Sequence, residues 1–221
     1  MRGRTFGVMA DATTARPVRS HPVFAVFYRR LCDVTDRAGF AKVRAALLAE
    51  ATGNVLEIGA GTGGNLPHYV NADRLSVVEP DPAMLKVLRT RLDRAPVPVE
   101  LMPAPAERIP YADGQFDTVV CTLVLCSVAD LDKAVAEAKR VLKPGGKVLF
   151  IEHVGAPSAK ARRTQQRIEP VWKRLFGGCL LTRDPVAAFE RAGFTEVAAE
   201  DVVLGRNPAP AKPIIRGSAR A

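Results

Sequence analysis

One glutamate and a cluster of glycines between Val55 and Asn65 have the spacing of a nucleotide-binding turn. An apolar run ends there in glycines, which lack a Cβ and therefore let the backbone approach a ligand closely. Gly59, Gly61 and Gly64 fit the dinucleotide pattern G-x-G-x-x-G. A second pattern, E-x-G-x-G-x-G, is matched in the same segment by Glu57, Gly59, Gly61 and Gly63. The two patterns predict different cofactors.

The carboxylate of Glu57 favours S-adenosylmethionine, the cofactor of the second pattern, over the dinucleotide of the first. It stands two residues before Gly59, at the expected end of a strand, where a pyrophosphate group would be repelled by it. S-adenosylmethionine carries a sulfonium and an ammonium group, so an acid beside it is favourable. Glu79 lies twenty positions beyond Gly59 and is suited to accept hydrogen bonds from both ribose hydroxyls of either cofactor.

Composition limits the class of protein. The chain has 221 residues, of which 48% are hydrophobic, and no apolar run reaches the ~18–20 residues that cross a bilayer. The cysteines are scattered without a C-x-x-C pair, at Cys32, Cys121, Cys126 and Cys179. This pattern argues against a structural metal and against a disulfide framework. We therefore expect reduced thiols and a cytoplasmic protein that binds no metal.

The net charge of +9 is concentrated in two segments, Arg2–Arg44 and Lys160–Arg174. Such segments form solvated helix faces, or they attract an anionic membrane surface or an acidic substrate. Aromatic residues make up only 6% of the chain, and the Asn/Asp-Pro-Pro-Tyr/Phe motif of amino-methylating nucleic-acid enzymes is absent. We expect no nucleic-acid partner. The composition gives no indication of the oligomeric state.

Strand and helix patterns alternate from Asn54 to Glu152. The predicted strands are Val55–Ile58, Leu75–Val78, Val97–Met102, Phe116–Thr122 and Lys147–Glu152. The predicted helices are Asn65–Tyr69, Pro82–Leu92 and Leu131–Leu142. This alternation predicts an α/β fold, doubly wound around a mostly parallel sheet, with ligands at the carboxyl ends of the strands.

The remaining segments complete one predicted domain over residues 21–221, after a flexible N-terminus at 1–20. Two amphipathic helices in 21–52 precede a cofactor-binding core at 54–153 and could cover a pocket. Helices and terminal strands on the substrate side occupy 154–221. They are Lys160–Phe176, Asp184–Ala192, Thr195–Leu204 and Ile214–Ser218, with a hairpin loop at Asn207–Pro210 between the last two.

Three blocks together resemble class I S-adenosylmethionine-dependent methyltransferases of the UbiE/type 11 kind. They are Leu56–Gly63, Ala106–Pro110 with Asp113–Asp117, and Val141–Gly146. The resemblance implies a seven-stranded Rossmann-like sheet that ends in an antiparallel hairpin. It also implies S-adenosylmethionine as cofactor, and we assign its binding to Glu57, Gly59, Ala60, Gly61, Gly63, Asn65, Glu79, Pro80, Ala106, Glu107, Cys121, Thr122 and Leu123. Pro105 replaces the usual aspartate of these enzymes, so the adenine amino group needs another acceptor.

A narrower resemblance reaches into the substrate half of the chain. The segments Val120–Val128 and Glu152–Val154 are similar to the methyltransferase-like-seven group, whose animal members methylate thiols. Further matching segments are Gln165-Gln166, Pro170-x-Trp172, Gly178–Arg183 and Lys212–Gly217. The apolar N-terminus that anchors those animal proteins in membranes is missing from this sequence.

His153 follows Glu152 at the end of the last predicted parallel strand, on the ligand edge of the sheet. A neutral imidazole there could take the proton of an acceptor, or it could only cap the strand end. We predict methyl transfer to a small lipophilic acceptor, a thiol on the narrower resemblance, with His153 as the catalytic residue.

Other functions stay open at this point. The basic helices would suit N- or O-methylation of a membrane lipid or a quinol-type substrate, with the protein peripheral to the membrane. A non-catalytic module that binds S-adenosylmethionine for regulation is an alternative of another class, and an NAD-dependent oxidoreductase is the last.

Overall fold

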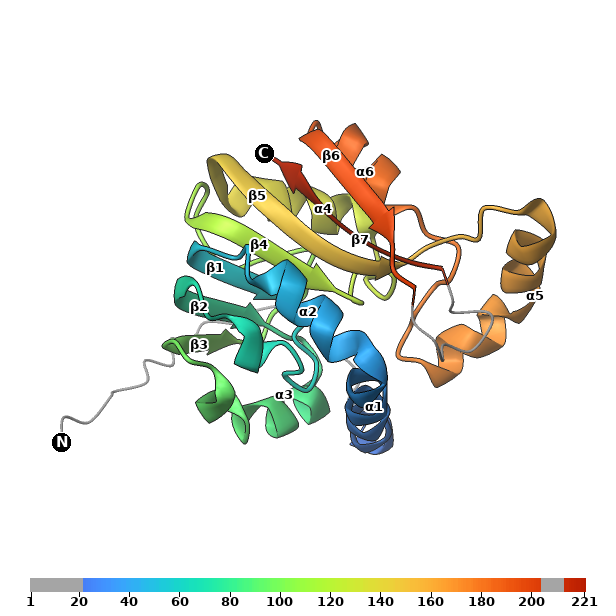
Figure 1. Cartoon of the computed structure of the whole chain (residues 1–221), viewed down its shortest axis with the longest axis horizontal. Coiled ribbons are helices and arrows are strands. Elements are labelled where there is room, and N and C mark those ends of the chain that lie inside the picture. The colour runs from blue at the N-terminus through green and yellow to red at the C-terminus, as the bar shows by residue number, and fades with distance from the viewer. Residues whose placement is uncertain (1–21, 204–212) are drawn as a thin grey trace.

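A single seven-stranded sheet is the centre of the computed structural model, which describes residues 22–203 and 213–221 (Figure 1). Its strand order is β3-β2-β1-β4-β5-β7-β6. The first five strands run parallel, and β7 is antiparallel to both of its neighbours. The strands are β1 (Gly53–Ile58), β2 (Ala72–Val78), β3 (Val99–Met102), β4 (Phe116–Thr122), β5 (Leu142–His153), β6 (Thr195–Asp201) and β7 (Ile214–Arg220). The predicted fold class is confirmed.

Helices cover both faces of this sheet. They are α1 (Pro22–Thr35), α2 (Ala41–Leu48), α3 (Pro82–Arg89), α4 (Leu131–Val141), α5 (Ala159–Leu175) and α6 (Pro185–Arg191), with short turns η1 (Asp36–Phe40), η2 (Leu66–His68) and η3 (Leu92–Arg94). Side chains of α4 and α6 pack on one face, and side chains of α2 and α3 pack on the other. The central strands are buried on both faces, which explains their continuous apolar runs. In the described part of the chain, no helix is long and apolar enough to span a bilayer.

Some predicted boundaries were wrong. The predicted helix Asn65–Tyr69 is only the 3₁₀ turn η2, because β2 begins at Ala72 and leaves no room for a longer helix. The predicted strand at Lys147 begins at Leu142, because Leu142 already pairs with Phe116 of β4. The expected N-terminus at 1–20 and the loop Asn207–Pro210 lie outside the described residues.

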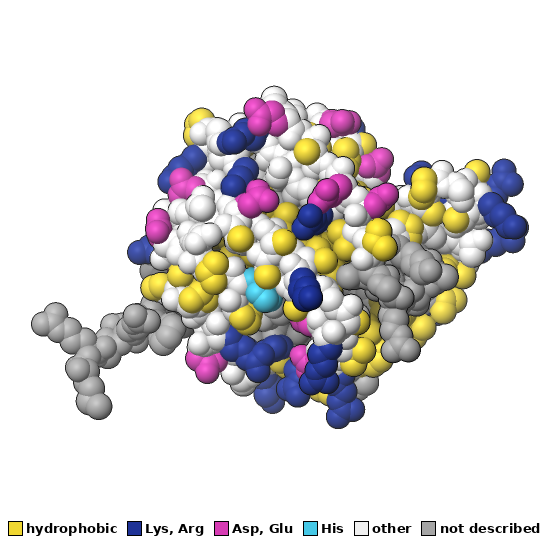
Figure 2. Space-filling view, viewed as in Figure 1, with side chains coloured by type: hydrophobic (Ala, Val, Ile, Leu, Met, Phe, Trp, Pro, Cys, Tyr) yellow, Lys and Arg dark blue, Asp and Glu magenta, His cyan; other side chains and the backbone are white. Residues whose placement is uncertain are grey.

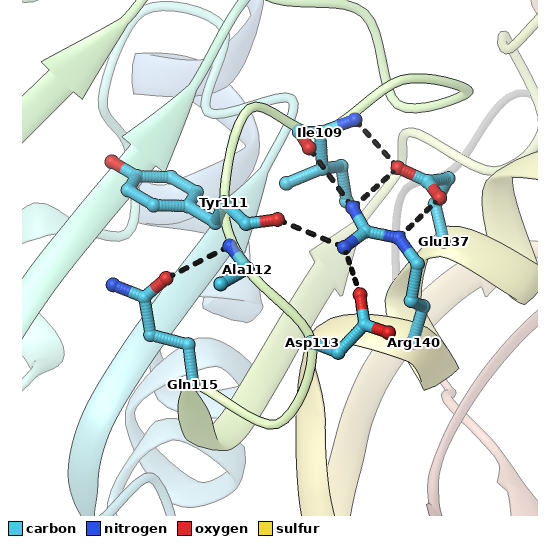
Figure 3. Close-up of polar contacts among 7 residues, drawn as sticks. All are labelled: Ile109, Tyr111, Ala112, Asp113, Gln115, Glu137 and Arg140. Atoms are coloured by element: carbon cyan, nitrogen blue, oxygen red, sulfur yellow. Dashed lines mark hydrogen bonds and ion pairs between the residues drawn. The ribbon is translucent and has the colours of Figure 1, made fainter.

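Arg140 of α4 fixes the segment that follows β3 (Figure 3). Its guanidinium donates to both carboxylate oxygens of Glu137, at 2.6 and 2.8 Å. It also donates to the carbonyl oxygens of Ile109 and Tyr111 and to the Asp113 carboxylate. Glu137 in turn accepts from the Ile109 amide at 2.8 Å. One half-buried guanidinium therefore holds this loop against α4.

Glu152 at the end of β5 holds the loop that follows β4. The residue is fully buried, and its carboxylate accepts from the backbone amides of Val124, Leu125 and Cys126 at 2.9, 2.8 and 3.2 Å. Burial raises the pKa of Glu152 to about 7, against the lowering effect of these donors. Leu123, the first residue of the loop, has φ 54°, an uncommon conformation for a residue with a side chain. The loop conformation thus depends on Glu152.

We expect Glu152→Ala to lower the free energy of unfolding by about 3–5 kcal/mol, because three buried amides lose their acceptor. Glu152→Gln keeps one carbonyl oxygen for Val124 and Leu125 and should lose less than half as much. Urea unfolding followed by circular dichroism measures both. Equal stability of wild type and Glu152→Ala would show that other contacts hold the loop.

Candidate functional site

A cavity of about 560 Å³ opens at the carboxyl ends of the parallel strands. Its walls come from the loops after β1, β2, β3 and β4, from the end of β5, and from α1 and α5. Eight of the predicted site residues line it: Gly59, Gly61, Glu79, Pro80, Ala106, Glu107, Leu123 and His153. The position agrees with the rule that open α/β sheets bind ligands at this edge.

The glycine turn has the geometry of the second sequence pattern. Gly59, Gly61 and Gly63 have φ values of 67°, 54° and 78°, whereas Gly64 is not in the left-handed region. A Cβ at Gly59 would overlap Val124, and one at Gly63 would lie 2.7 Å from Leu66. A Cβ at Gly61 would touch only the Tyr28 ring of α1, at 3.4 Å. Gly59 and Gly63 are therefore needed for packing, and Gly61 keeps the cavity open.

Glu79 shapes the turn from the neighbouring strand. One of its carboxylate oxygens accepts from the Gly61 amide at 2.8 Å, and the other accepts from the Asp81 amide at 2.9 Å. Burial raises the pKa of Glu79, and these two donors oppose the rise. Because a carboxylate oxygen has two lone pairs, each oxygen can accept one more hydrogen bond. Glu79 lines the cavity and can offer those lone pairs to a ligand.

Glu57 lies behind the cavity wall in a polar network. It is 1% exposed, and its Oε1 accepts from Asn65 Nδ2 at 2.8 Å. The same nitrogen donates to Thr122 Oγ1 at 3.0 Å. Burial raises the pKa of Glu57 to about 7. Three predicted site residues from two strands and a turn are thus brought together, although none of the three is in the cavity lining.

The remaining predicted cofactor residues without a cavity-lining position are Ala60, Gly63 and Cys121. Cys121 is fully buried and packs in the apolar cluster on the α4 side of the sheet. Burial raises its pKa well above the ordinary value for a thiol. Cys121 is therefore a packing residue. Side chains alternate between the two faces along β4, and that of Cys121 points to the α4 side.

Arg44 of α2 was missed by the sequence analysis. It lines the cavity, yet the residue is only 4% exposed. Its guanidinium donates to Asn65 Oδ1 at 2.6 Å and to Asp36 Oδ1 at 3.2 Å. A signal was present, because Arg44 stands in the stripe of Phe40, Leu47 and Leu48, which are buried. A cation in an apolar helix stripe indicates a buried polar partner.

The segment after β3 contributes Pro105, Ala106 and Glu107 to the lining. The Glu107 carboxylate accepts from the amides of Ala129 and Asp130, at 2.7 and 3.1 Å, and so fixes the start of α4. Ala106 is 5% exposed and presents backbone to the cavity wall. The side chain of Glu107 is therefore occupied by structural contacts, and the backbone of this segment is available to a ligand.

His153 lines the cavity opposite the glycine turn, at the end of β5. Its Nδ1 is buried and has no hydrogen-bond partner among the described residues. Burial lowers the pKa of His153 to about 4, so the ring is neutral at physiological pH. A neutral imidazole has one nitrogen that donates and one that accepts a hydrogen bond, and because Nδ1 has almost no accessible surface, a ligand in the cavity would meet the ring at another atom.

Aromatic side chains form the end of the cavity that lies next to α1 and α5. Trp172 and Phe176 of this wall are stacked, with ring centroids 3.9 Å apart. Phe27 of α1 approaches Phe176 at 6.4 Å. The cavity thus has a polar end at the glycine turn and an apolar end beside α5. No group of three or more potential metal ligands occurs among residues 22–203 and 213–221.

Known proteins are similar to this chain in sequence and in fold. A family model described as a methyltransferase domain matches residues 56–150. The human thiol S-methyltransferase TMT1B is 38% identical over 187 residues, which cover 83% of this chain and 75% of that protein.

Solved structures show the same fold at low sequence identity. A SAM-dependent methyltransferase of Thermotoga maritima superposes with a TM-score of 0.65 at 21% identity, covering 90% of this chain and 97% of its own. The N-methyltransferase NodS of Bradyrhizobium japonicum, solved with S-adenosyl-L-homocysteine, gives 0.60 at 18% identity over 85% of each chain. With the sequence match to TMT1B, these findings identify the chain as a member of the S-adenosylmethionine-dependent methyltransferase family.

Proposed function

We propose that this enzyme transfers a methyl group from S-adenosylmethionine to a small apolar thiol. The observation that supports this most is one cavity lined by the glycine turn, by the aromatic side chains of Trp172 and Phe176, and by the neutral imidazole of His153. The similarity to a thiol S-methyltransferase over three quarters of that protein supports the choice of acceptor.

The polar end of the cavity fits the cofactor. Gly61 leaves space where a side chain would stand, and Glu79 keeps lone pairs for the ribose hydroxyls. The backbone around Ala106 would contact adenine, while Glu57 and Asn65 would act on the methionine part from behind the wall. When bound, S-adenosylmethionine supplies an electrophilic methyl group on a positively charged sulfur.

Arg44 belongs to this cofactor site on the same grounds. Arg44 is buried and lines the cavity. Its guanidinium packs against Gly64, where an added Cβ would lie 3.5 Å from Cζ. We assign to Arg44 the carboxylate of the methionine part, because a guanidinium is a strong donor to carboxylates. Asp36 and Asn65 hold it in place.

His153 would act on the acceptor as a hydrogen-bond partner. A group with a pKa of about 4 is a weak base, so full transfer of a thiol proton to it is unfavourable. The ring can hydrogen-bond to the thiol and orient its sulfur; the thiol releases its proton to solvent, and the thiolate attacks the methyl group. The aromatic wall excludes water and holds the apolar part of the acceptor.

Exposed apolar side chains on α1 and α5, two helices that line the cavity, favour a second candidate. This apolar rim consists of Val26, Phe27 and Val34 of α1 with Val171 and Leu175 of α5, which are 49–63% exposed. Figure 2 shows Lys and Arg side chains gathered at the lower end of this face, around the position of α1. We propose peripheral contact with an anionic membrane, and N- or O-methylation of a lipid or quinol-type acceptor is the alternative reaction.

The cofactor site is tested by two matched glycine variants. Gly61 and Gly114 have similar φ values, 54° and 64°, but only Gly61 lines the cavity. Alanine at either position should cost about 1 kcal/mol of stability. We expect only Gly61→Ala to weaken S-adenosylmethionine binding, by about tenfold or more in calorimetry. Equal affinities of the two variants would refute the assignment.

The acceptor is tested with isotope-labelled S-adenosylmethionine and a panel of aryl and alkyl thiols, phenols and amines. We expect turnover with thiols and a rate that rises with pH up to the pKa of each thiol, because His153 is already neutral and adds no inflection near pH 6.5. His153→Ala should lower turnover by about 10²-fold or less while cofactor affinity stays within about twofold.

Three results would contradict this assignment. A bell-shaped profile with a histidine inflection would contradict the role given to His153. Turnover with phenols or amines alone would favour the second candidate. Cofactor binding without any turnover would favour a regulatory module.

Membrane contact is tested by sedimentation with phosphatidylserine vesicles and neutral phosphatidylcholine vesicles. We expect binding to the anionic vesicles that weakens as salt rises. Val34→Asp should reduce it, whereas Val70→Asp, an equally exposed valine outside the rim, should not. Equal binding to both vesicle types, or equal loss in both variants, would show that the rim is not a membrane-binding surface.

A further inference from the structure

Two free thiols stand in the wall at the apolar end of the cavity. Cys126 belongs to the loop after β4, and Cys179 to the loop after α5. They are 2% and 6% exposed. The Leu180 amide donates to the Cys126 carbonyl oxygen at 2.8 Å, which keeps the two loops side by side. Both thiols pack in one cluster with Leu181, Trp172 and Phe176.

The two loops differ in how firmly they are held. The Cys126 amide donates to the buried Glu152 carboxylate, so this cysteine has a fixed backbone. Cys179 follows Gly177 and Gly178, which have φ values of 58° and 91°. Glycines in this region allow larger changes of the backbone than other residues. The Cys179 amide is also held, by the Phe176 carbonyl oxygen at 3.1 Å, so the adjustment that brings the two sulfurs together falls on the two glycines that precede Cys179.

The thiols also differ in acidity. A hydrogen bond with Cys126 lowers the pKa of Cys179, and the same interaction raises the pKa of Cys126. Thiolates are the nucleophiles of thiol–disulfide exchange, so Cys179 is the first of the pair to react. Cys179 is also the more exposed of the two.

We propose that Cys126 and Cys179 form a thiol–disulfide site that small apolar disulfides oxidise, and that the oxidised pair slows methyl transfer in the same cavity. Such disulfides are the oxidised forms of the thiols that the enzyme is proposed to methylate. A cavity that admits the thiol therefore also admits a small disulfide. The effect on methyl transfer rests on the proposed function, whereas the formation of the disulfide does not.

The chemistry balances within the exchange. The Cys179 thiolate attacks one sulfur of the small disulfide, and the first small thiolate leaves and takes up the proton released from Cys179. The Cys126 sulfur then attacks Cys179 Sγ in the mixed disulfide, and the second small thiolate leaves with the Cys126 proton. Two protein S–H bonds are lost and one S–S bond is formed, while the small disulfide is reduced to two thiols. Excess thiol reverses both steps.

The consequence for activity follows from the position of the pair. A disulfide would pull the Cys179 loop toward the Cys126 loop. The stacked rings of Trp172 and Phe176 lie just before Cys179 in the chain and would move with it. The glycine turn and Glu79 line the same cavity but do not belong to the cluster that contains the two thiols. We therefore expect oxidation to lower turnover and to leave cofactor affinity unchanged.

The test uses the full chain, reduced and then incubated with diethyl disulfide, a small apolar disulfide. We expect the intact protein to lose the mass of two hydrogens; after alkylation in denaturant, two of the four cysteines should be alkylated, and a linked peptide pair should contain Cys126 and Cys179. Turnover with the best thiol should fall by about tenfold or more and recover with dithiothreitol. Calorimetry should give the same affinity for S-adenosylmethionine within about twofold.

Variants identify the partners. Cys126→Ser and Cys179→Ser should each abolish the linked peptides, whereas Cys32→Ser, at another cysteine of the cavity wall, should retain them. Four free thiols after incubation, a link to Cys32, or a Cys126–Cys179 link with unchanged turnover would each overturn the proposal. If the reduced enzyme methylates no thiol, the proposed function fails, and the peptide result still decides whether the pair forms.

Discussion

The structure depends on carboxylates that are buried at one edge of the sheet. Glu57, Glu79 and Glu152 stand at or just beyond the carboxyl ends of β1, β2 and β5, and each is at most 6% exposed. A buried carboxylate is costly unless donors surround it. Each of the three therefore organises the chain beside it: Glu57 binds Asn65, Glu79 binds the glycine turn, and Glu152 binds the loop after β4. The walls of the cavity follow from this one requirement.

Two neighbouring side chains at the same edge of the sheet have different roles. Glu152 and His153 are neighbours in sequence, but the alternation of a strand turns one toward a loop and the other toward the cavity. Burial acts on both in the direction of the neutral form, with a pKa of about 7 for the glutamate and about 4 for the histidine. The outcome is a cavity that is polar at the glycine turn, is apolar beside α5 and contains a neutral imidazole.

Two arginines complement these acids. Arg140 ties the segment after β3 to α4 through carbonyl oxygens and carboxylates, which places Ala106 at the cavity. Arg44 reaches the network of Glu57 and Asn65 from α2. Both guanidiniums join segments that are distant in sequence, so the cavity and the core of the sheet are stabilised by the same contacts.

The sequence by itself determined the α/β fold and the region of the site, because apolar periodicity and a glycine pattern are local properties of the chain. The glycines of the E-x-G-x-G-x-G pattern were identified from spacing alone, and all three have positive φ, which only residues without a Cβ adopt at low cost. Gly217 shows the limit of such reasoning: its matching block was recognised, but only the pairing of β7 shows that a Cβ there would overlap the Ala198 carbonyl oxygen. The partners of Arg44, the Cys126–Cys179 pair and the low pKa of His153 were decided by tertiary structure alone. Burial and contacts between distant segments create these properties, and neither is encoded in local spacing.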